Sequence, residues 1–292
     1  MDAVTALTRL GGISPAGRIV ALSSRKRLAT AVRRGQIVKL SRNRYCLPVT
    51  EHGLGYAREL AGHLSHLSAA LHHGWEVCFP PEKPQLIVPS AVEVPAGIAW
   101  AVESTRSDLR PKDTDGWATS RLHTVLLCAR DLPPRDALAV ADSALRHGDL
   151  TATGLLDAAH AWRGAGRDRI LAMARLADAR AANPFESALR MLAIESGLDV
   201  VPQWEVRSSG LVLHPDLADP IRGIALEADS WTHHGAQSAD HDRDCERYNA
   251  LVVAGWIVLR FTWTQVMLAP HEVRATLAAV LDAMERGDIR VT

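Results

Sequence analysis

Apolar and polar positions in the first fifty residues follow a helical period and then a strand period. The helical part predicts three short helices, at residues 2–10, 14–22 and 25–34. Apolar and polar side chains then alternate around a turn at 41–43, which predicts a β-hairpin made of residues 36–40 and 44–47. Three helices followed by a hairpin have the element order of a winged helix-turn-helix, and we expect that fold for residues 1–50.

Helical and strand patterns alternate in the next segment, residues 51–182. A helical period covers residues 57–74 and closes at Gly74, and a short strand is expected at 85–88. Three further helices are expected, at residues 135–147, 151–162 and 167–180. Four histidines fall on helix faces of this segment, namely His63, His66, His72 and His73. Such histidines are more often surface or satisfied core residues than metal ligands, so we expect an α/β segment whose role the sequence does not reveal.

The last third of the chain, residues 183–292, begins with a capped helix. Asn183 is the expected N-cap and Pro184 lies in the first turn, so Glu186 falls on the helix face of Leu189 and points partly inward. Strands are then expected at 200–206, 211–217 and 224–228, a helix at 239–253, a buried strand at 256–261 and a final helix at 271–285. This order predicts a compact mixed α/β sandwich.

Composition narrows the class of protein. A chain of 292 residues suits two or three domains, and we expect them at 1–50, 51–182 and 183–292. A hydrophobic content of 47% supports a packed core and excludes wholesale disorder. The four cysteines lie far apart, which argues against a zinc ribbon or a disulfide framework. The first residues do not resemble a signal peptide, and no apolar run approaches the ~20 residues of a membrane span. We therefore expect a soluble, cytoplasmic protein with no membrane contact.

Basic residues concentrate at the start of the chain, although the formal net charge is zero. Residues 1–50 hold ten Lys and Arg and one acid, a formal charge of +9, so the rest of the chain carries −9. Such a segment is typical of a protein that binds a polyanion, with a merely solvated surface as the alternative. The candidate DNA-binding residues are Arg25, Lys26, Arg27, Arg33 and Arg34 on the third helix and Lys39, Arg42 and Arg44 on the hairpin.

The segment GGIS…LSSRKRLATAVRRGQIVKLSRNRYCL resembles the winged-helix domain of AbiEi-type antitoxins from type IV toxin–antitoxin systems. The resemblance covers about 45 residues and implies that this part of the chain docks on duplex DNA. That family usually has a glycine before the strand tyrosine. Arg44 stands there in this chain, so a differently shaped wing is expected.

Acidic residues are expected to meet at one edge of the C-terminal sheet. Asp216 ends one predicted strand and Glu227 lies in the adjacent one, while Asp229 follows on the same strand face as Glu227. Phosphodiester hydrolysis uses hard oxygen ligands for Mg²⁺ or Mn²⁺, which neutralises the phosphate and activates a water. Clustered carboxylates on neighbouring strands suit that chemistry, and an ordinary solvated sheet edge is the alternative.

The spacing P-D-x10-E-x-D resembles the PD-(D/E)XK nuclease superfamily, and the wider pattern resembles the branch related to very-short-patch mismatch-repair (Vsr) endonucleases. The match covers about 90 residues and implies a restriction-endonuclease-like α/β sandwich that binds a divalent metal. The matched positions are Glu186, Gln203, Asp216, Glu227, Asp229, His234, Asp244, Arg247, Gly255-Trp256 and Leu259-Arg260-Phe261-Thr262. The resemblance implies metal binding by Asp216, Glu227 and Asp229. It also implies catalytic roles for Glu186 and His234.

The chain departs from the pattern of that branch at one position. Ser230 replaces a glycine that the branch commonly has. Asp229 stands where most members of the superfamily keep a lysine, as it does in this branch. Without that lysine, water activation is expected to come from the metal, with His233 or His234 as a candidate base.

Three of the candidate residues also have a plain structural interpretation. Arg243 and Arg247 are candidates for phosphate contact, and pairing with the acids in support of the fold is the alternative. Glu186 lies in the first turn of its helix, where a carboxylate also favours the helix dipole.

The sequence thus predicts a divalent-metal-dependent DNA endonuclease that nicks or cleaves duplex or structured DNA. The resemblance suggests a role in DNA repair or mobile-element defence. One alternative is a DNA-binding transcriptional regulator or antitoxin with a non-cleaving nuclease-like tail, and another is a tail that only binds special DNA structures. Retention of Asp216, Glu227 and Asp229 together favours cleavage. DNA is the expected partner, and the sequence leaves open whether the chain forms a homodimer or binds another protein.

Overall fold

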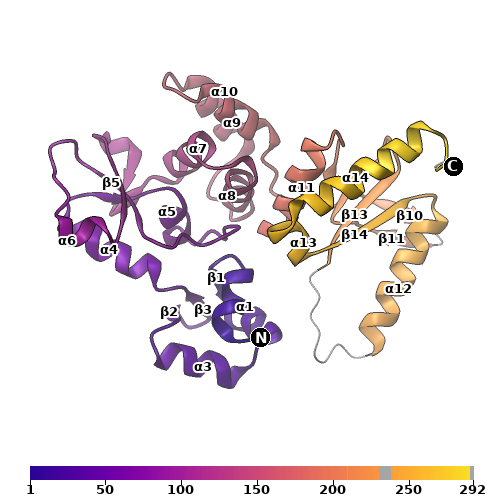
Figure 1. Ribbon diagram of the computed structural model, residues 1–292, viewed down its shortest axis with the longest axis horizontal. Coiled ribbons are helices and arrows are strands. Elements are labelled where there is room, and N and C mark those ends of the chain that lie inside the picture. The colour runs from indigo at the N-terminus through magenta and orange to yellow at the C-terminus, as the bar shows by residue number, and fades with distance from the viewer. Residues whose placement is uncertain (209, 230–237, 290–292) are drawn as a thin grey trace. The chain divides into compact units, whose positions relative to one another are not determined.

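The computed structural model describes residues 1–208, 210–229 and 238–289, with the backbone alone for residues 50 and 238–244 (Figure 1). The chain divides into two compact units, Met1–Ala179 and Arg180–Thr292. Helices and sheets occur in both units, so the expected mixed α/β class is confirmed. Among the residues described, no helix combines the length and the apolar character needed to cross a membrane.

The first unit opens with the elements of a winged helix. In chain order they are α1 (Ala3–Arg9), β1 (Ile13–Pro15), α2 (Ala16–Leu22), α3 (Arg25–Arg33), β2 (Val38–Ser41) and β3 (Arg44–Cys46). The strands form an antiparallel sheet in the order β1-β3-β2, so the hairpin β2-β3 is the wing. The sequence pattern missed β1, because three residues are too few to show an alternation. Leu7, Ile19 and Leu28 from the three helices share one small core.

The turn after α1 packs closely against residues 74–77. Val77 donates a backbone hydrogen bond to the carbonyl of Gly11 at 3.1 Å. Gly11 has a φ of +87°, and a Cβ there would lie 2.7 Å from the Cβ of Glu76, so the position requires glycine. Arg44 of the wing donates to the carbonyl of Gly74. These contacts join residues 1–50 to the next segment within one unit.

The segment after the wing forms a five-stranded mixed sheet with helices beside it. Its elements are α4 (Val49–Glu59), β4 (His63–Leu64), α5 (His66–His72), β5 (Gln85–Val88), α6 (Ala96–Ala99), β6 (Glu103–Arg106), η1 (Pro111–Asp113), β7 (Thr114–Asp115) and β8 (Ala118–Thr119). The strand order is β6-β5-β4-β8-β7. The expected strand at 85–88 is confirmed as β5.

The single helix expected at 57–74 is wrong, because β4 separates α4 from α5. Ala61 ends the helical path with a φ of +47°. Gly62 then lies so close to β5 that a Cβ would be 2.7 Å from the carbonyl oxygen of Ile87. The apolar spacing nevertheless continues across the break, since Leu60 and Leu64 are both buried in the same core.

Four helices complete the first unit: α7 (Arg121–Asp131), α8 (Pro134–Arg146), α9 (Ala152–Ala161) and α10 (Arg167–Leu176). The last three confirm the expected helices to within a few residues. Their bounds agree with the turn glycines at 148, 164 and 166, where the sequence already indicated breaks.

Glu76 forms a cluster of hydrogen bonds and ion pairs in the first unit. Its Oε2 accepts hydrogen bonds from Ser143 at 2.8 Å and Arg146 at 2.8 Å, and lies 3.0 Å from Nε2 of His147. Burial alone would raise the pKa of Glu76, but the hydrogen bonds and the positive charge of Arg146 lower it to about 2. The loop that packs on Gly11 is therefore fastened to α8 by an ionised carboxylate.

The second unit contains the following elements: α11 (Pro184–Glu195), β9 (Val201–Pro202), β10 (Val206–Ser208), β11 (Leu211–Leu213), β12 (Leu217–Asp219), β13 (Ile224–Asp229), α12 (Ser238–Val253), β14 (Ile257–Thr262), α13 (Trp263–Leu268) and α14 (Pro270–Glu285). The main sheet has the order β14-β13-β12-β9, with β13 and β14 parallel and the other pairs antiparallel. Ala225 of β13 packs with Leu251 of α12 and with Val206 and Leu213 of the hairpin β10-β11. Helices α11, α13 and α14 pack against one another, and α11 also contacts β13 (Figure 1).

The strand expected at 211–217 is in fact two strands. Leu211–Leu213 pairs with β10, whereas Leu217–Asp219 enters the main sheet between β9 and β13. His214 and Pro215 lie between them, and Pro215 has no N–H with which to continue a ladder. As a consequence, Asp216 immediately precedes β12 and does not end a longer strand.

We expect Glu76→Gln to destabilise the protein at neutral pH and to have little effect in acid. A carboxylate whose pKa is depressed stabilises the fold above its unfolded value of about 4.5, and that stability is lost as pH falls toward about 2. The difference between the proteins should be on the order of 3 kcal/mol at pH 7 and should shrink between pH 4.5 and 2. Urea denaturation followed by circular dichroism measures it. Glu205→Gln, which breaks an exposed ion pair with Arg207, is the matched control and should leave stability unchanged.

Candidate functional site

Asp216 and Glu227 face each other across β12 and β13. Leu217 pairs with Leu226 in the antiparallel ladder, so Asp216 and Glu227 are the next residues in register. Residues two apart on a strand share a face, and Glu227 therefore lies on the α12 side of the sheet with Ala225. The two carboxyl groups lie close enough for the charge of Asp216 to raise the pKa of Glu227. The structure thus brings together the acidic pair that the sequence placed on neighbouring strands.

Asp216 accepts backbone hydrogen bonds from Ala228 and from Gln203, which hold it in place. Its Oδ2 accepts the backbone N–H of Ala228 at 2.9 Å, and its carboxyl group also contacts the side chain of Gln203. Gln203 donates its own backbone N–H to the carbonyl of Asp216 at 3.2 Å, with a φ of +55° that is rare for a residue other than glycine. Strain of this kind persists where surrounding contacts hold it, often in functional sites. Gln203 was matched from the sequence, but its backbone conformation gave no sequence signal.

Arg247 reaches Glu227 from α12. Its Nη2 donates to Oε1 and Oε2 of Glu227 at 2.8 and 3.1 Å, and to the carbonyl of His214 at 2.9 Å. Glu227 is 2% exposed, so this ion pair lies in the interior of the unit. For Arg247 the structure therefore supports pairing with the acids, the alternative to phosphate contact in the sequence analysis.

One buried and one half-buried carboxyl group beside a single guanidinium leave the site short of positive charge. Burial, followed by the nearby charge of Asp216, raises the pKa of Glu227 to about 8 in spite of Arg247. Burial also raises the pKa of Asp216, although hydrogen bonds from Ala228 and the charge of Arg247 oppose the change. Both carboxyl groups are thus easier to protonate than free acids, because the unit does not fully compensate two negative charges.

Asp229 lies on the strand face of Glu227, as expected, but it is paired separately. Its Oδ2 accepts from Arg260 of β14 at 2.6 Å. Arg260 in turn lies 4.2 Å above the ring of Tyr248, one residue after Arg247 on α12. Within the described part of the chain no three His, Cys, Asp or Glu side chains are grouped as a metal site. A metal-ligand role for Asp229 stays a prediction.

Glu186 has its contacts at the start of its own helix. The side chain accepts from the backbone N–H of Ala182 at 2.8 Å and from Nδ2 of Asn183 at 2.7 Å. Asn183 caps the helix in return by accepting from the backbone of Phe185 and of Glu186. These bonds favour the structural interpretation of Glu186, and its catalytic role stays a prediction.

Other expected site residues lie outside the described part of the structure. His233 and His234 belong to the segment 230–237, and the side chains of Arg243 and Asp244 are not described although their backbone is part of α12. Their proposed roles stay predictions from the sequence.

The donor set at Asp216 and Glu227 fits a small hard cation. Magnesium is commonly held by one or two carboxylates and completes its octahedron with waters and substrate phosphates. Two adjoining carboxyl groups with incompletely balanced charge provide the hard oxygen atoms and the negative potential that such an ion needs. Asp216 and Glu227 are thus the residues that would hold Mg²⁺ or Mn²⁺.

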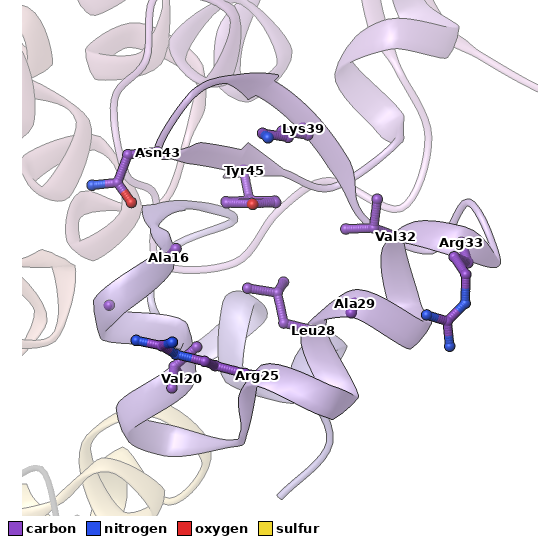
Figure 2. Close-up of a pocket in the computed structure, with 11 residues that line it drawn as sticks. Ala16, Val20, Arg25, Leu28, Ala29, Val32, Arg33, Lys39, Asn43 and Tyr45 are labelled. Atoms are coloured by element: carbon purple, nitrogen blue, oxygen red, sulfur yellow. The ribbon is translucent and has the colours of Figure 1, made fainter.

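A second candidate site lies on the winged helix, where a groove of about 740 Å³ separates α3 from the wing. Figure 2 shows Leu28 and Val32 of α3 facing Tyr45 of the hairpin across this groove. Arg25 and Arg33 line the groove from the two ends of α3, and Lys39 and Asn43 line it from the wing. A smaller groove of about 590 Å³ on the other side of α3 is lined by Lys26, Arg27 and Arg34. The four basic residues of α3 and Arg34 at its C-cap are all exposed and divide between the two grooves. Asn43 and Tyr45 also line the groove, although the sequence did not indicate them. Tertiary packing decides which residues of the hairpin face α3.

Arg44 differs from the other basic residues of this region. It is half-buried and donates to Gly74, so the contact surface expected from the sequence loses one of its members. The reason is packing, since the wing leans against the turn after α5. Arg27 donates to the carbonyl of Met1 at 2.8 Å but stays exposed, and Arg42 is exposed near the tip of the wing.

We expect Glu227→Gln to stabilise the protein at alkaline pH in buffer that contains EDTA. A carboxyl group whose folded pKa is raised contributes stability below its unfolded value of about 4.5, and that contribution is lost as pH rises through about 8. The wild type should therefore lose stability between pH 5 and pH 8.5, and the variant should exceed it at pH 8.5 by on the order of 2 kcal/mol. Thermal unfolding at several pH values measures the gap. Glu195→Gln, which breaks a partly exposed pair with Arg274, should show no such pH-dependent gain.

No known protein-family model matches the chain, and no curated protein matches it. Among solved structures, it is similar to the crystal structure of the RV2827C protein from Mycobacterium tuberculosis, with 15% sequence identity and a TM-score of 0.31. The similarity covers 71% of this chain and 87% of that chain. At this TM-score the likeness carries no inference about function.

Proposed function

We propose that the protein is a divalent-metal-dependent DNA endonuclease, in which the winged helix binds DNA and the second unit hydrolyses a phosphodiester. The observation that carries this proposal is the placement of Asp216 opposite Glu227 across β12 and β13, with Glu227 buried and Asp216 half-buried. Two adjoining acids shielded from water repel each other, and such groups concentrate where chemistry uses them. The resemblance of their spacing to PD-(D/E)XK nucleases agrees with this function.

Each residue around the acidic pair has its own role in the proposed reaction. Mg²⁺ bound by Asp216 and Glu227 would supply Lewis acidity at the phosphate and lower the pKa of a water. The backbone N–H of Ala228 and the side chain of Gln203 fix the orientation of Asp216. Arg247 holds Glu227 in place and offsets part of its charge. Orientation of ligands by surrounding hydrogen bonds is what tunes a site of this kind.

The charge at the start of α3 supports DNA as the substrate. Arg25, Lys26 and Arg27 occupy the first helical turn, which holds no acid. The helix dipole places partial positive charge at the same end, so three cations there repel it unless an anion is near. DNA phosphates would supply that anion. The groove between α3 and the wing has cations at its rim and apolar side chains on its walls.

A second candidate function has an observation in its favour. Arg247 already pairs with Glu227, and Arg260 already pairs with Asp229, as supporting ion pairs would. A DNA-binding transcriptional regulator or antitoxin with a non-cleaving nuclease-like unit would have this arrangement. The raised pKa of both Asp216 and Glu227 favours the nuclease, since a purely structural ion pair keeps its carboxylate readily ionised.

The setting of the proposed activity is the cytoplasm. All four cysteines are free thiols, as is usual for proteins kept in a reducing compartment. DNA repair or defence against mobile elements is the role that the family resemblance suggests.

We expect the full chain to cleave DNA in Mg²⁺ or Mn²⁺, and Asp216→Ala to abolish cleavage. Removal of one of two carboxylate ligands should lower the rate by a factor of about a hundred or more, because the phosphate charge is no longer offset. Supercoiled, mismatched and branched DNA are incubated with each protein and separated on a gel. Asp288→Asn changes an exposed acid of the same unit and should cleave like the wild type.

Equal cleavage by the wild type and Asp216→Ala would assign the activity to a contaminant or to another site. If none of the substrates is cut by a preparation that binds DNA, the regulator becomes the better conclusion.

We also expect the protein to bind duplex DNA with weak sequence preference and a strong dependence on salt. Each phosphate that a Lys or Arg neutralises releases counterions and steepens the dependence of affinity on salt. Fluorescence anisotropy between about 50 and 200 mM salt, a range over which several phosphate contacts weaken affinity by about 10³-fold, measures the slope. Arg25→Ala with Arg42→Ala should reduce the slope by about 2, or about 1 for each arginine replaced. Arg207→Ala with Arg286→Ala removes the same charge from exposed positions of the second unit and should leave the slope unchanged. A slope that is flat for the wild type would contradict binding by this basic surface.

A further inference from the structure

The guanidinium of Arg247 uses one nitrogen for all of its hydrogen bonds to described residues. Nη2 alone contacts Glu227 and the carbonyl of His214, so Nη1 and Nε have no hydrogen-bond acceptor in the part of the chain that is described. The side chain is 29% exposed, whereas that of Glu227 is 3% exposed. Arg247 thus occupies both carboxylate oxygens of Glu227 with one nitrogen and keeps part of its guanidinium open to solvent.

Asp219, in the same sheet, shows how this protein compensates the charge of a buried carboxylate. Arg222 and Asp219 at the end of β12 form an ion pair at 2.8 Å, and Asp219 also accepts the backbone N–H groups of Asp199, Ile221 and Arg222. Those donors satisfy Asp219 and lower its pKa even though burial opposes the change. Asp219 is therefore fully compensated by the protein. Glu227 accepts hydrogen bonds from Arg247 and lies opposite a second acid, Asp216, so its negative charge is less completely compensated.

Counting formal charges shows which ligands the site needs. With Asp216 and Glu227 ionised, Arg247 leaves one negative charge uncompensated. A divalent cation added to that set leaves one positive charge in excess, and a phosphodiester carries one negative charge. With both acids ionised, a metal and a DNA phosphate together make the site neutral, and uncompensated charge in an interior is costly.

We propose that Arg247 couples metal binding to DNA binding, by leaving Glu227 when the metal arrives and donating its guanidinium to the phosphate that the metal holds. This inference rests on the proposed nuclease function and adds a role for one residue of the same site. Without DNA, Arg247 competes with the metal for Glu227 and keeps metal affinity low. With DNA, the phosphate accepts the displaced guanidinium, whose free nitrogen atoms suit the two oxygens of a phosphate.

The coupling has a reciprocal form that can be measured without catalysis. If DNA raises the affinity for the metal, the metal must raise the affinity for DNA by the same factor. Isothermal titration calorimetry of the full chain with Mn²⁺, alone and with a duplex that carries non-cleavable phosphorothioates, measures the first. Anisotropy with and without Mn²⁺ measures the second. We expect a factor of about ten or more in each direction for the wild type.

Substitutions separate this role from simple support of the fold. Arg247→Ala removes the competitor, so Mn²⁺ should bind more tightly than to the wild type in the absence of DNA, and DNA should no longer tighten it. Arg247→Lys keeps a cation beside Glu227, so weak binding without DNA should return. Arg222→Ala, which removes the ion pair with Asp219 at the end of β12, is the matched control and should keep the wild-type coupling.

The outcomes distinguish failure of this inference from failure of the nuclease proposal. If Mn²⁺ binds the wild type through Asp216 with an affinity that DNA does not change, the coupling is overturned while the metal site stands. Weaker Mn²⁺ binding by Arg247→Ala than by the wild type would also overturn it, since that result means support and not competition. If Mn²⁺ binds the wild type and Asp216→Ala equally, with or without DNA, the metal site itself is rejected and the inference falls with it. The wild-type measurements decide the matter even if Arg247→Ala does not fold.

Discussion

The contact between Asp216 and Glu227 is the constraint on which the interpretation of the second unit depends. Antiparallel pairing of β12 with β13 sets the two residues opposite each other, with Glu227 buried and Asp216 half-buried. The two negative charges repel each other. The guanidinium of Arg247 and the backbone N–H of Ala228 offset part of this repulsion. The fold thus maintains a concentration of negative charge that it does not itself neutralise. That excess is what a divalent cation would use.

Glu76 shows that this chain is able to bury a carboxylate without leaving charge uncompensated. Ser143, Arg146 and His147 all approach one of its oxygens, and the net effect lowers its pKa to about 2. Glu227 is similarly buried, yet its pKa moves in the opposite direction, to about 8. Burial is common to both groups, so the number and sign of the neighbours make the difference. Glu76 therefore fastens a loop to α8, whereas Glu227 is suited to bind something.

The winged helix also concentrates charge that the protein does not itself neutralise, and there the charge is positive. Its basic side chains are exposed on both sides of α3, and three of them lie at the N-terminal end, where the helix dipole already carries positive potential. Arg44 is the exception, because the wing uses it to contact Gly74. The fold uses that one cation to join the wing to the following segment, whereas the cations of α3 remain exposed on its surface. Counting basic residues along the sequence could not separate these two uses.

The sequence by itself determined the mixed α/β class, most of the helices and the identity of the central acids. The cap at Asn183 gave the start of α11 correctly, since a cap acts on backbone within a few residues of itself. The spacing of Asp216 and Glu227 was likewise enough to place them on neighbouring strands. Such features depend on interactions between residues that are close in the sequence, so a sequence pattern is enough to predict them.

Tertiary structure decided how those elements are interrupted and which charges they bring together. The helical period of 57–74 concealed β4, because residues on a helix and on a strand can be buried in one core. Pro215 divided the expected strand at 211–217, and the partners of its two halves lie elsewhere in the chain. The pairing of Arg247 with Glu227 and of Arg260 with Asp229 spans 20 and 31 residues. Contacts between distant residues depend on how strands and helices pack, which no local pattern specifies.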